Sequence, residues 1–512
     1  MLNNLNDKHS WKESLAAAKH RQVLNMLLLG FSAGLPILLI FSSLSLWMGE
    51  AGIEKSAVTY FSWAALGYSF KFVWAPLVDC LPIPFLTSWL GLRRSWLLVS
   101  QFGVMLAITL MAFSNPAIES DLFYMAIGAV LLGFSSATQD ISIDAYRIEA
   151  ASADMQGMMT ASYVAGYRIS MIVAGAGVLY LASHLGTSKE DYRYEAWKYT
   201  YHVMSLCMLV GVFITLIMKE PISRVKTHAF KVQDYLRLVI AFVLSVTGFI
   251  VCFWLSQDIV SSVKAYFNNA NLSGFILEVT RLFFAIGIAY WVAKAAILLN
   301  IVDRKVVDIS YVAPIKSFFE NYSMKTALLL LALIGLYRVS DIVLGVISNI
   351  FYQDMGFTKI EIADAVKIFG VIMTIVGAFL GGILAMRIGV MRVLFAGAIL
   401  VVLTNLLFIV LVYSGHNLHV LYFVVAADNL VAGIATSAFI AFLSSLVDVR
   451  FTAMQYAMFS SLMTLIPKLL AGYSGSIVDS LGYTPFFIIA SCMGLPVLIL
   501  VYMANKSLKI RR

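Results

Sequence analysis

Long apolar runs recur along the whole chain, and they constrain its fold more than any other feature. A run of about 18 or more apolar residues is long enough to cross a membrane as a helix. Of the 512 residues, 61% are hydrophobic and only 12% are charged, whereas charged residues make up about a quarter of a typical soluble domain. We therefore expect an all-α polytopic membrane protein.

Counting these runs predicts fourteen membrane-spanning helices, with ends that are uncertain by a few residues. The expected spans are 22–48, 57–78, 95–115, 121–143, 157–183, 198–218, 236–256, 276–300, 325–352, 362–386, 391–414, 418–446, 453–477 and 483–504. The first run is long enough to span the bilayer itself, and no short apolar core with a cleavage site precedes it. A cleaved signal peptide is therefore not expected.

Basic residues in the short loops predict the orientation of these spans, because cytoplasmic loops carry an excess of Lys and Arg. With the N-terminus inside, the cytoplasmic segments contain Lys19, Arg21, Arg93, Arg94, Lys219, Arg224, Lys226, Lys231, Arg304, Lys305, Lys316, Arg387, Arg392, Lys506, Lys509, Arg511 and Arg512. Both termini are therefore expected in the cytoplasm. The net charge of +8 follows from this loop bias, and nucleic-acid binding is not expected.

The fourteen spans divide into two groups of six and a central pair. Two loops echo each other: "FVWAPLVDCLPIPFLTSWLGLRR" in the first half and "VGAFLGGILAMRIGVMR" in the second both lead from a helix end through small residues into a basic loop. Two six-helix halves with a binding site between them describe the major facilitator fold. The expected segments are an N-terminal segment 1–21, a first half 22–235, a two-helix insertion 236–320, a second half 321–505 and a tail 506–512.

Several motifs carry a more specific resemblance. In the first half these are "LLLGFSAGLP", "FKFVWAPLVD", "LRRSWLL", "SSATQDISIDAYRIE" and "GYRISM"; in the second they are "LYRVSD", "VGAFLGGIL", "DNLVAGIATSAFIAFLSSL" and "FTAMQYAMFSSL". Over roughly residues 22–505 the chain resembles the AmpG-type muropeptide permeases, a major facilitator branch that also contains acetyl-CoA transporters and siderophore importers. One departure is Cys80, which follows Asp79 where a basic residue is usual.

This resemblance implies a function. It implies proton-driven import of anhydro-muropeptides, which are N-acetylglucosaminyl-anhydro-N-acetylmuramic acid with or without peptide, across the inner membrane for peptidoglycan recycling. The transporter is expected to act as a monomer in the lipid bilayer. The alternative is import of a siderophore or another carboxylate-bearing metabolite, which the same charged residues would suit.

The stretch "TQDISIDAYRIE" places two carboxylates, Asp140 and Asp144, four residues apart and therefore on one face of a helix. A charge deep in the bilayer costs about 2.5–3.5 kcal/mol on insertion scales, so such residues are functional candidates. One interpretation is a proton-binding pair, since neighbouring carboxylates disfavour each other's ionisation. The other is a latch at the cytoplasmic gate, formed with Arg93, Arg94 or Arg147.

Other ionisable residues lie within the expected spans. Arg168 could neutralise Asp140 or bind an anionic substrate group through its two-pronged guanidinium. Lys71 could contact substrate or extend to the cytoplasm. Arg338 and Asp341 are three residues apart and could form an ion pair or line the cavity.

Asp428 is a second candidate for proton binding, with a buried hydrogen-bonding role as the alternative, and Lys468 is the counterpart of Arg168 in the second half. Asp79, Arg93 and Arg94 belong to the expected cytoplasmic gate loop. Stacking and hydrogen bonding to a sugar are expected from Gln139, Tyr167, Tyr337 and Gln455, although aromatic residues in membrane helices more often serve packing.

Other function classes have no matching residues in the sequence. No His/Cys or His/Asp constellation lies within the spans, so an enzyme is not expected, and the glycine-rich patches lack the strand and lysine of a phosphate loop. The four cysteines are scattered, and His416 and His419 have no further ligand nearby. We expect neither a cofactor nor a metal.

Overall fold

The computed structural model describes residues 20–40, 42–53, 68, 70–152, 155–188, 191–221, 232–264, 270–471 and 474–510, and these residues form helices and no strand. Residues 1–19 of the expected N-terminal segment, residues 57–67 of the second expected span and the last two residues of the tail lie outside the described residues. The expectation of an all-α fold is confirmed for the described residues.

Eleven helical segments among the described residues are long and apolar enough to cross a membrane. They are Arg21–Glu50, Leu92–Ala112, Glu119–Ala150, Gln156–His184, Tyr194–Ile217, Leu236–Leu255, Met324–Asp354, Ala363–Ile388, Val390–Ser414, Leu418–Leu446 and Tyr483–Leu508. The expected spans 276–300 and 453–477 also fall on helices, α16 (Ala270–Leu298) and α25 (Thr452–Ala471). The total of fourteen spans and the cytoplasmic position of both termini stay predictions.

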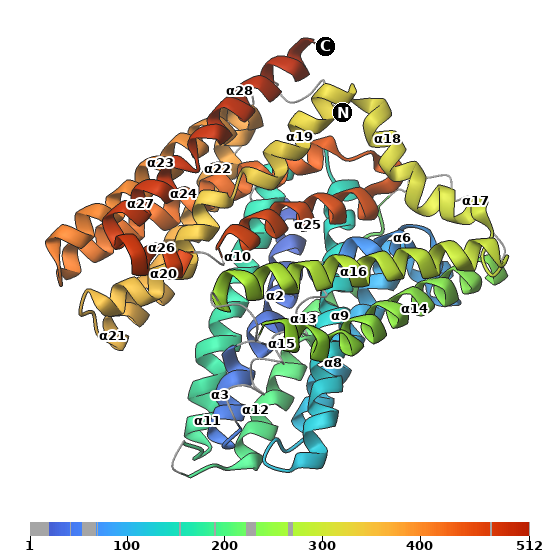
Figure 1. The fold of residues 1–512 in the computed structure, drawn as a ribbon, viewed down its shortest axis with the longest axis horizontal. Helices are drawn as coiled ribbons and strands as arrows, with labels where there is room; N and C mark the ends of the chain where they lie inside the picture. Colours follow the sequence, from blue (N-terminus) through green and yellow to red (C-terminus); the bar gives the residue numbers. More distant parts are fainter. Residues whose placement is uncertain are drawn as a thin grey trace. The chain divides into compact units, whose positions relative to one another are not determined.

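The chain forms two compact units: one contains Met1–Val78, Pro82–Val225 and Phe318–Arg512, and the other contains Asp79–Leu81 and Lys226–Ser317. The boundaries of the five expected segments stay predictions. The first half of the larger unit contains, among its described helices, α2 (Arg21–Ile40), α3 (Ser42–Glu50), α8 (Leu92–Ala112), α9 (Glu119–Ala150), α10 (Gln156–Ile172), α11 (Val178–His184), α12 (Tyr194–Cys207) and α13 (Leu209–Ile217) (Figure 1).

Close helix packing in this first half depends on glycine. Helix α2 lies along α10, and a Cβ atom on Gly166 would come within 1.9 Å of the backbone oxygen of Leu27. Only a residue without a side chain permits this approach.

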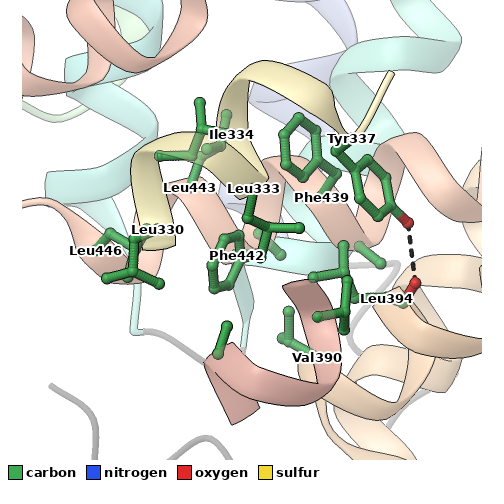
Figure 2. Packing of buried hydrophobic residues seen from close by; sticks show 14 of the residues in the cluster. Leu330, Leu333, Ile334, Tyr337, Val390, Leu394, Phe439, Phe442, Leu443 and Leu446 are labelled. Atoms are coloured by element: carbon green, nitrogen blue, oxygen red, sulfur yellow. Dashed lines mark hydrogen bonds between the residues drawn. The ribbon is translucent and has the colours of Figure 1, made fainter. Parts of the chain in front are cut away.

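The second half of the larger unit contains α19 (Met324–Leu336), α20 (Val339–Asp354), α21 (Lys359–Ile362), η7 (Ala363–Phe369), α22 (Gly370–Ile388), α23 (Val390–Ser414), α24 (Leu418–Leu446), α25, α26 (Ser474–Leu481), α27 (Tyr483–Cys492) and α28 (Leu495–Ile510). Its core is shown in Figure 2, where Tyr337 stacks on Phe439 with ring centroids 4.3 Å apart and donates a hydrogen bond of 3.0 Å to the backbone oxygen of Leu394. The helix α22 packs on α24 as α2 packs on α10, with Gly377 at the close approach.

The two halves of this unit meet through a limited set of elements. Helix α10 packs against α22 and α24, and α25 packs against α9 and the short helix η3 (Lys71–Val73). Ser437 of α24 donates a hydrogen bond of 3.1 Å to the backbone oxygen of Gly157 at the start of α10. A Cβ atom on Gly382 of α22 would come within 3.0 Å of the same oxygen, so the backbones approach closely here.

In the smaller unit, α14 (Val232–Leu255) and α16 pack side by side, followed by α17 (Arg304–Val307) (Figure 1). The buried Arg281 of α16 donates to the backbone oxygen of Phe253 at 3.0 Å and to the hydroxyl of Ser256 at 3.1 Å. Its guanidinium also lies 3.8 Å from the centre of the Phe253 ring. This charge is therefore compensated by the C-terminal end of α14, where carbonyl groups lack helical partners.

Candidate functional site

Asp140, Asp144 and Arg147 lie on one face of α9, as their spacing of four and three residues requires. The ammonium of Lys71, from η3, lies 3.8 Å from an oxygen of Asp140 and 3.7 Å from an oxygen of Asp144. The guanidinium of Arg147 lies 3.3 Å from the other oxygen of Asp144. These four residues, which we call the charge quartet, contain two anions and two cations, so their charges balance.

Phenol groups surround the carboxylates of the quartet. Tyr163 of α10 donates a hydrogen bond of 3.3 Å to Asp140, and its ring lies 6.0 Å from that of Tyr167, one turn later. Tyr68 is hydrogen-bonded to Ser136, one turn before Asp140 on α9. The side chains of Asp140 and Asp144 keep 14% and 15% of their surface exposed.

Arg147 is enclosed far more completely, with 1% of its side chain exposed. It donates to Gln156 at 3.1 Å and Thr160 at 3.3 Å, both on α10 of its own half. It also donates to Ser444 of α24 at 2.8 Å, and its guanidinium lies 5.1 Å from the ring centre of Tyr456 of α25. Arg147 therefore joins the two halves. The latch hypothesis named this arginine among three candidates, and it is the one that the structure pairs with Asp144.

The other two arginines of that hypothesis tie together helix ends within the first half. Arg93 forms an ion pair of 2.6 Å with Glu149 and donates to the backbone oxygen of Val78 at 3.1 Å. Arg94 donates to the backbone oxygen of Leu216 at 2.6 Å.

Glu220, just beyond α13, accepts from the backbone N–H groups of Arg93 at 2.8 Å and Arg94 at 3.1 Å. Burial raises the pKa of Glu220, and these two hydrogen bonds partly oppose the rise. The expected gate residue Asp79 is buried near the end of α6 (Ala75–Cys80).

A second charged group lies where the helix between Met324 and Asp354 is interrupted. The break falls between α19 and α20, at Tyr337 and Arg338. Arg338 forms an ion pair of 3.2 Å with Asp341 in the first turn of α20. Both side chains line a small pocket, and Ala435 and Thr436 of α24 form another part of its wall. Broken membrane helices of this kind form substrate and ion sites in transporters.

Arg168 of α10 belongs with this second group. Its guanidinium is close enough to Arg338 and Asp341 for their charges to interact, and it also contacts the sulfur of Met171 at 3.9 Å. Among the contacts of the described residues it makes no ion pair with Asp140. Its two expected roles, neutralising Asp140 and binding an anionic substrate group, stay predictions. Asp428 of α24 is half-buried and interacts electrostatically with Asp341.

Lys367, in η7, is a candidate that the sequence analysis missed. Its charge interacts with that of Arg168 from the other half. The signal was present, because Lys367 lies inside the expected span 362–386 and an ionisable residue within a span is a functional candidate.

Three of the neutral residues expected to bind substrate are occupied by protein contacts in this conformation. Gln139 is fully buried and donates a hydrogen bond of 3.0 Å to Ser32. Gln455 is buried and accepts from the backbone N–H of Asp448 at 2.7 Å. Tyr337 belongs to the core of Figure 2. Lys468 of α25 is exposed, and Tyr167 is half-buried near the quartet.

Within the described ranges, no group of three or more His, Cys, Asp or Glu side chains is arranged to hold a metal ion. The two charged groups offer ion pairs, hydrogen bonds and ionisable carboxylates. An anion can be held by the cations Arg168, Arg338 and Lys367, and a proton can be exchanged at the carboxylates.

Comparison with known proteins places the chain among transporters. No protein-family model matches it. It is 30% identical over 490 residues to a Rickettsia conorii protein named "Putative transporter AmpG 4", covering 95% of this chain and 98% of that one. The chain belongs to the AmpG family. It is also 27% identical to the anhydromuropeptide permease of Escherichia coli strain K12, over 95% of this chain and 80% of that protein.

Solved structures show the fold of this AmpG family member. The proton:xylose symporter XylE matches with a TM-score of 0.57 at 10% identity, over 96% of each chain. The E. coli fucose:proton symporter FucP matches with a TM-score of 0.56 at 11% identity, over 97% of this chain and 99% of that one. At these identities the likeness shows the fold alone, which is that of the major facilitator superfamily. The protein is a multi-pass membrane transporter with a small-molecule substrate, as its family and fold predict.

Proposed function

We propose that this AmpG family member imports anhydro-muropeptides across the inner membrane by proton-coupled alternating access, for peptidoglycan recycling. We further propose that it acts as a monomer with fourteen spans and both termini in the cytoplasm. The name of its E. coli relative, anhydromuropeptide permease, supports the substrate class.

The charge quartet is the observation that carries the proposal of proton coupling. Asp140 and Asp144 share Lys71, and both carboxylates keep a little exposure. Protonation of one carboxylate leaves the quartet with one anion for two cations, and an unpaired charge in a buried site is energetically costly. Asp341 and Asp428 form a second pair of candidate proton sites in the other half, since their charges interact.

Cationic side chains in both halves support an anionic substrate. Every anhydro-muropeptide with a peptide carries carboxylates, which guanidinium groups bind through two parallel hydrogen bonds. We assign this role first to Arg168 and Arg338, with Lys71, Lys367 and Lys468 as further cations and Tyr167 as a stacking surface. Gln139, Tyr337 and Gln455 would contact substrate only after a rearrangement, because all three side chains are buried and hydrogen-bonded to other parts of the protein. Asp79, Arg93 and Arg94 stay candidates for the cytoplasmic gate.

The test is uptake of labelled N-acetylglucosaminyl-anhydro-N-acetylmuramic acid into right-side-out membrane vesicles, with and without an uncoupler. Wild type is compared with Asp140→Asn and with Asp191→Asn as a matched control, because Asp191 is 64% exposed and pairs with a surface arginine, Arg193. We expect uptake that the uncoupler abolishes, that Asp140→Asn loses and that Asp191→Asn keeps. Absence of uptake by a well-inserted wild type would contradict the substrate and favour a siderophore or another carboxylate-bearing metabolite.

A further inference from the structure

Arg147 occupies an unusual place among the charged residues, because it is both the most enclosed cation of the quartet and a contact between the halves. Its hydrogen bond to Ser444 spans 297 residues of sequence. Gln156, Thr160, Ser444 and Tyr456, which surround it, are all buried. The closed contact between the halves therefore contains a guanidinium that water does not reach.

Such a cation depends on its counter-ion. The carboxylate nearest to Arg147 is Asp144, at 3.3 Å, and Asp144 is shared with Lys71 at 3.7 Å. Lys71 in turn is shared with Asp140 at 3.8 Å. While both carboxylates are ionised, each cation has one negative charge. When Asp140 takes up a proton, one carboxylate remains for two cations.

The other groups that face Asp140 do not replace the lost charge. They are Tyr68, Lys71 of η3, Tyr163 and Tyr167 of α10, Tyr456 of α25, and Asp144 of α9 itself. The tyrosines are neutral at physiological pH, because phenols ordinarily ionise near pH 10. Asp144 is thus the one remaining anion in this set.

We propose that Arg147 transmits protonation of Asp140 to the contact between the halves and so opens it. This inference rests on the proposed proton coupling and names the residue that carries it out. With Asp140 protonated, Lys71 and Arg147 compete for Asp144 and repel each other. Arg147 can leave this environment only by breaking its contacts with Ser444 and Tyr456, which weakens the packing of α24 and α25 against α9.

The same contact includes Ser437 and Gly157, which are hydrogen-bonded at 3.1 Å on the adjoining turns of α24 and α10. In the predicted orientation this end of the molecule faces the cytoplasm, because α9 ends there and α10 begins there. The structure then represents a state closed to the cytoplasm. Protonation would favour the state that releases substrate inside.

Ser437 provides a reporter for this opening, because its side chain is fully buried in the contact. Ser437→Cys is made in a protein whose four cysteines, Cys80, Cys207, Cys252 and Cys492, are replaced by serine. Alkylation of Cys at position 437 by a maleimide is followed in purified full-length protein at about pH 5 and about pH 8, and each rate is divided by the rate for unfolded protein at that pH. If the pKa of Asp140 differs by one unit between the closed and open states, the ratio of open to closed protein changes by about tenfold between a pH below both pKa values and a pH above them.

We expect the normalised rate to be roughly tenfold higher at the lower pH. Asp140→Asn, which mimics the protonated form, should label rapidly at both pH values, whereas the control Asp191→Asn should behave like the parent protein. Arg147→Met should abolish the dependence on pH. If that variant does not fold, Ser444→Ala serves instead: it should raise labelling at both pH values and leave their ratio unchanged, because it loosens the contact without altering charge.

Equal labelling of the parent protein at the two pH values, or slow labelling of Asp140→Asn, would overturn the proposal. The assay uses no substrate, so its outcome is separate from the uptake test. Labelling that depends on pH without muropeptide uptake contradicts the proposed substrate alone. Uncoupler-sensitive uptake with pH-independent labelling contradicts the role of Arg147 alone.

Discussion

The two charged groups of the larger unit are built differently. In the first half, the quartet of Lys71, Asp140, Asp144 and Arg147 draws on η3 and α9 and reaches Ser444 of the other half. In the second half, Arg338 and Asp341 pair within one turn at the start of α20. Two ion pairs of the first group join different elements, η3 and α9. The ion pair of the second group lies within one element, and Arg168 of α10 lies near it but forms no ion pair with it among the described residues.

This difference bears on how each group responds to movement. A pair within one helical turn travels with its helix, so its distance is preserved when the halves move. A group whose members lie on several elements must change when those elements separate. Rocking of one half against the other is the expected motion in this fold, and the quartet is therefore the better site for coupling that motion to a proton.

The largest expected contrast is in stability. Asp144→Asn leaves Arg147 enclosed without its nearest carboxylate, and removing one partner of a buried ion pair costs about 3–5 kcal/mol. Asp341→Asn removes the partner of Arg338, but this arginine side chain keeps 26% of its surface exposed where that of Arg147 keeps 1%. We therefore expect the smaller loss of a charged hydrogen bond, about 1.5–3 kcal/mol. Thermal unfolding of both variants in the same detergent compares the two losses.

Equal losses for Asp144→Asn and Asp341→Asn would contradict the comparison, because they would mean that the enclosure of Arg147 has no energetic consequence. The double variant Asp144→Asn with Arg147→Met sharpens the result. It should recover much of the loss, since removing both charges of a buried pair is often nearly neutral.

Much of the fold could be predicted from the sequence, and so could the face that carries the carboxylates. Membrane spans follow from apolar length, because the bilayer demands about 20 apolar residues whatever the neighbouring helices are. The spacing of Asp140 and Asp144 fixes their common face in any helix. Neither argument needs a partner from elsewhere in the chain.

Partners from elsewhere in the chain could not be predicted in this way. Local sequence shows neither that Lys71 lies between the two carboxylates nor that Arg147 reaches Ser444, because both contacts depend on the packing of distant helices. The same limit applies to Gln139. It neighbours Asp140 in sequence but points about 100° away around the helix, and it lies against Ser32 of α2 instead.

Two tyrosines, one in the core of the second half and one beside the quartet, test the same comparison with smaller expected effects. Tyr337→Phe removes a hydrogen bond to the backbone of Leu394 and keeps the stacking on Phe439, so a loss of about 1 kcal/mol in the free energy of unfolding is expected. Tyr163→Phe removes the phenol that donates to Asp140. It should shift the pH profile of uptake, which Tyr337→Phe should leave in place. A shift caused by Tyr337→Phe alone would contradict the assignment of proton coupling to the quartet.

The smallest expected effect concerns an exposed pair at the far end of the second half. Glu361 of α21 lies 3.0 Å from the ring nitrogen of His416 and accepts from the backbone N–H of Thr358 at 2.7 Å. The hydrogen bond from His416 is the largest of the causes that lower the pKa of Glu361 from 4.5 to about 2.

The pKa of Glu361 is lower in the folded state than its ordinary value of 4.5. Its ionised form therefore stabilises the fold at pH values above 4.5, and this stabilisation is lost as the pH falls toward about 2. Glu361→Gln should therefore lower the unfolding temperature slightly at neutral pH, by an amount that declines over this range. His416→Gln should shrink the same decline, because the main cause of the lowered pKa is then absent. If the difference in unfolding temperature between wild type and Glu361→Gln stays constant down to about pH 2, the pair acts through packing. Exposed charges in the second half would then contribute little to stability, as the comparison with the quartet predicts.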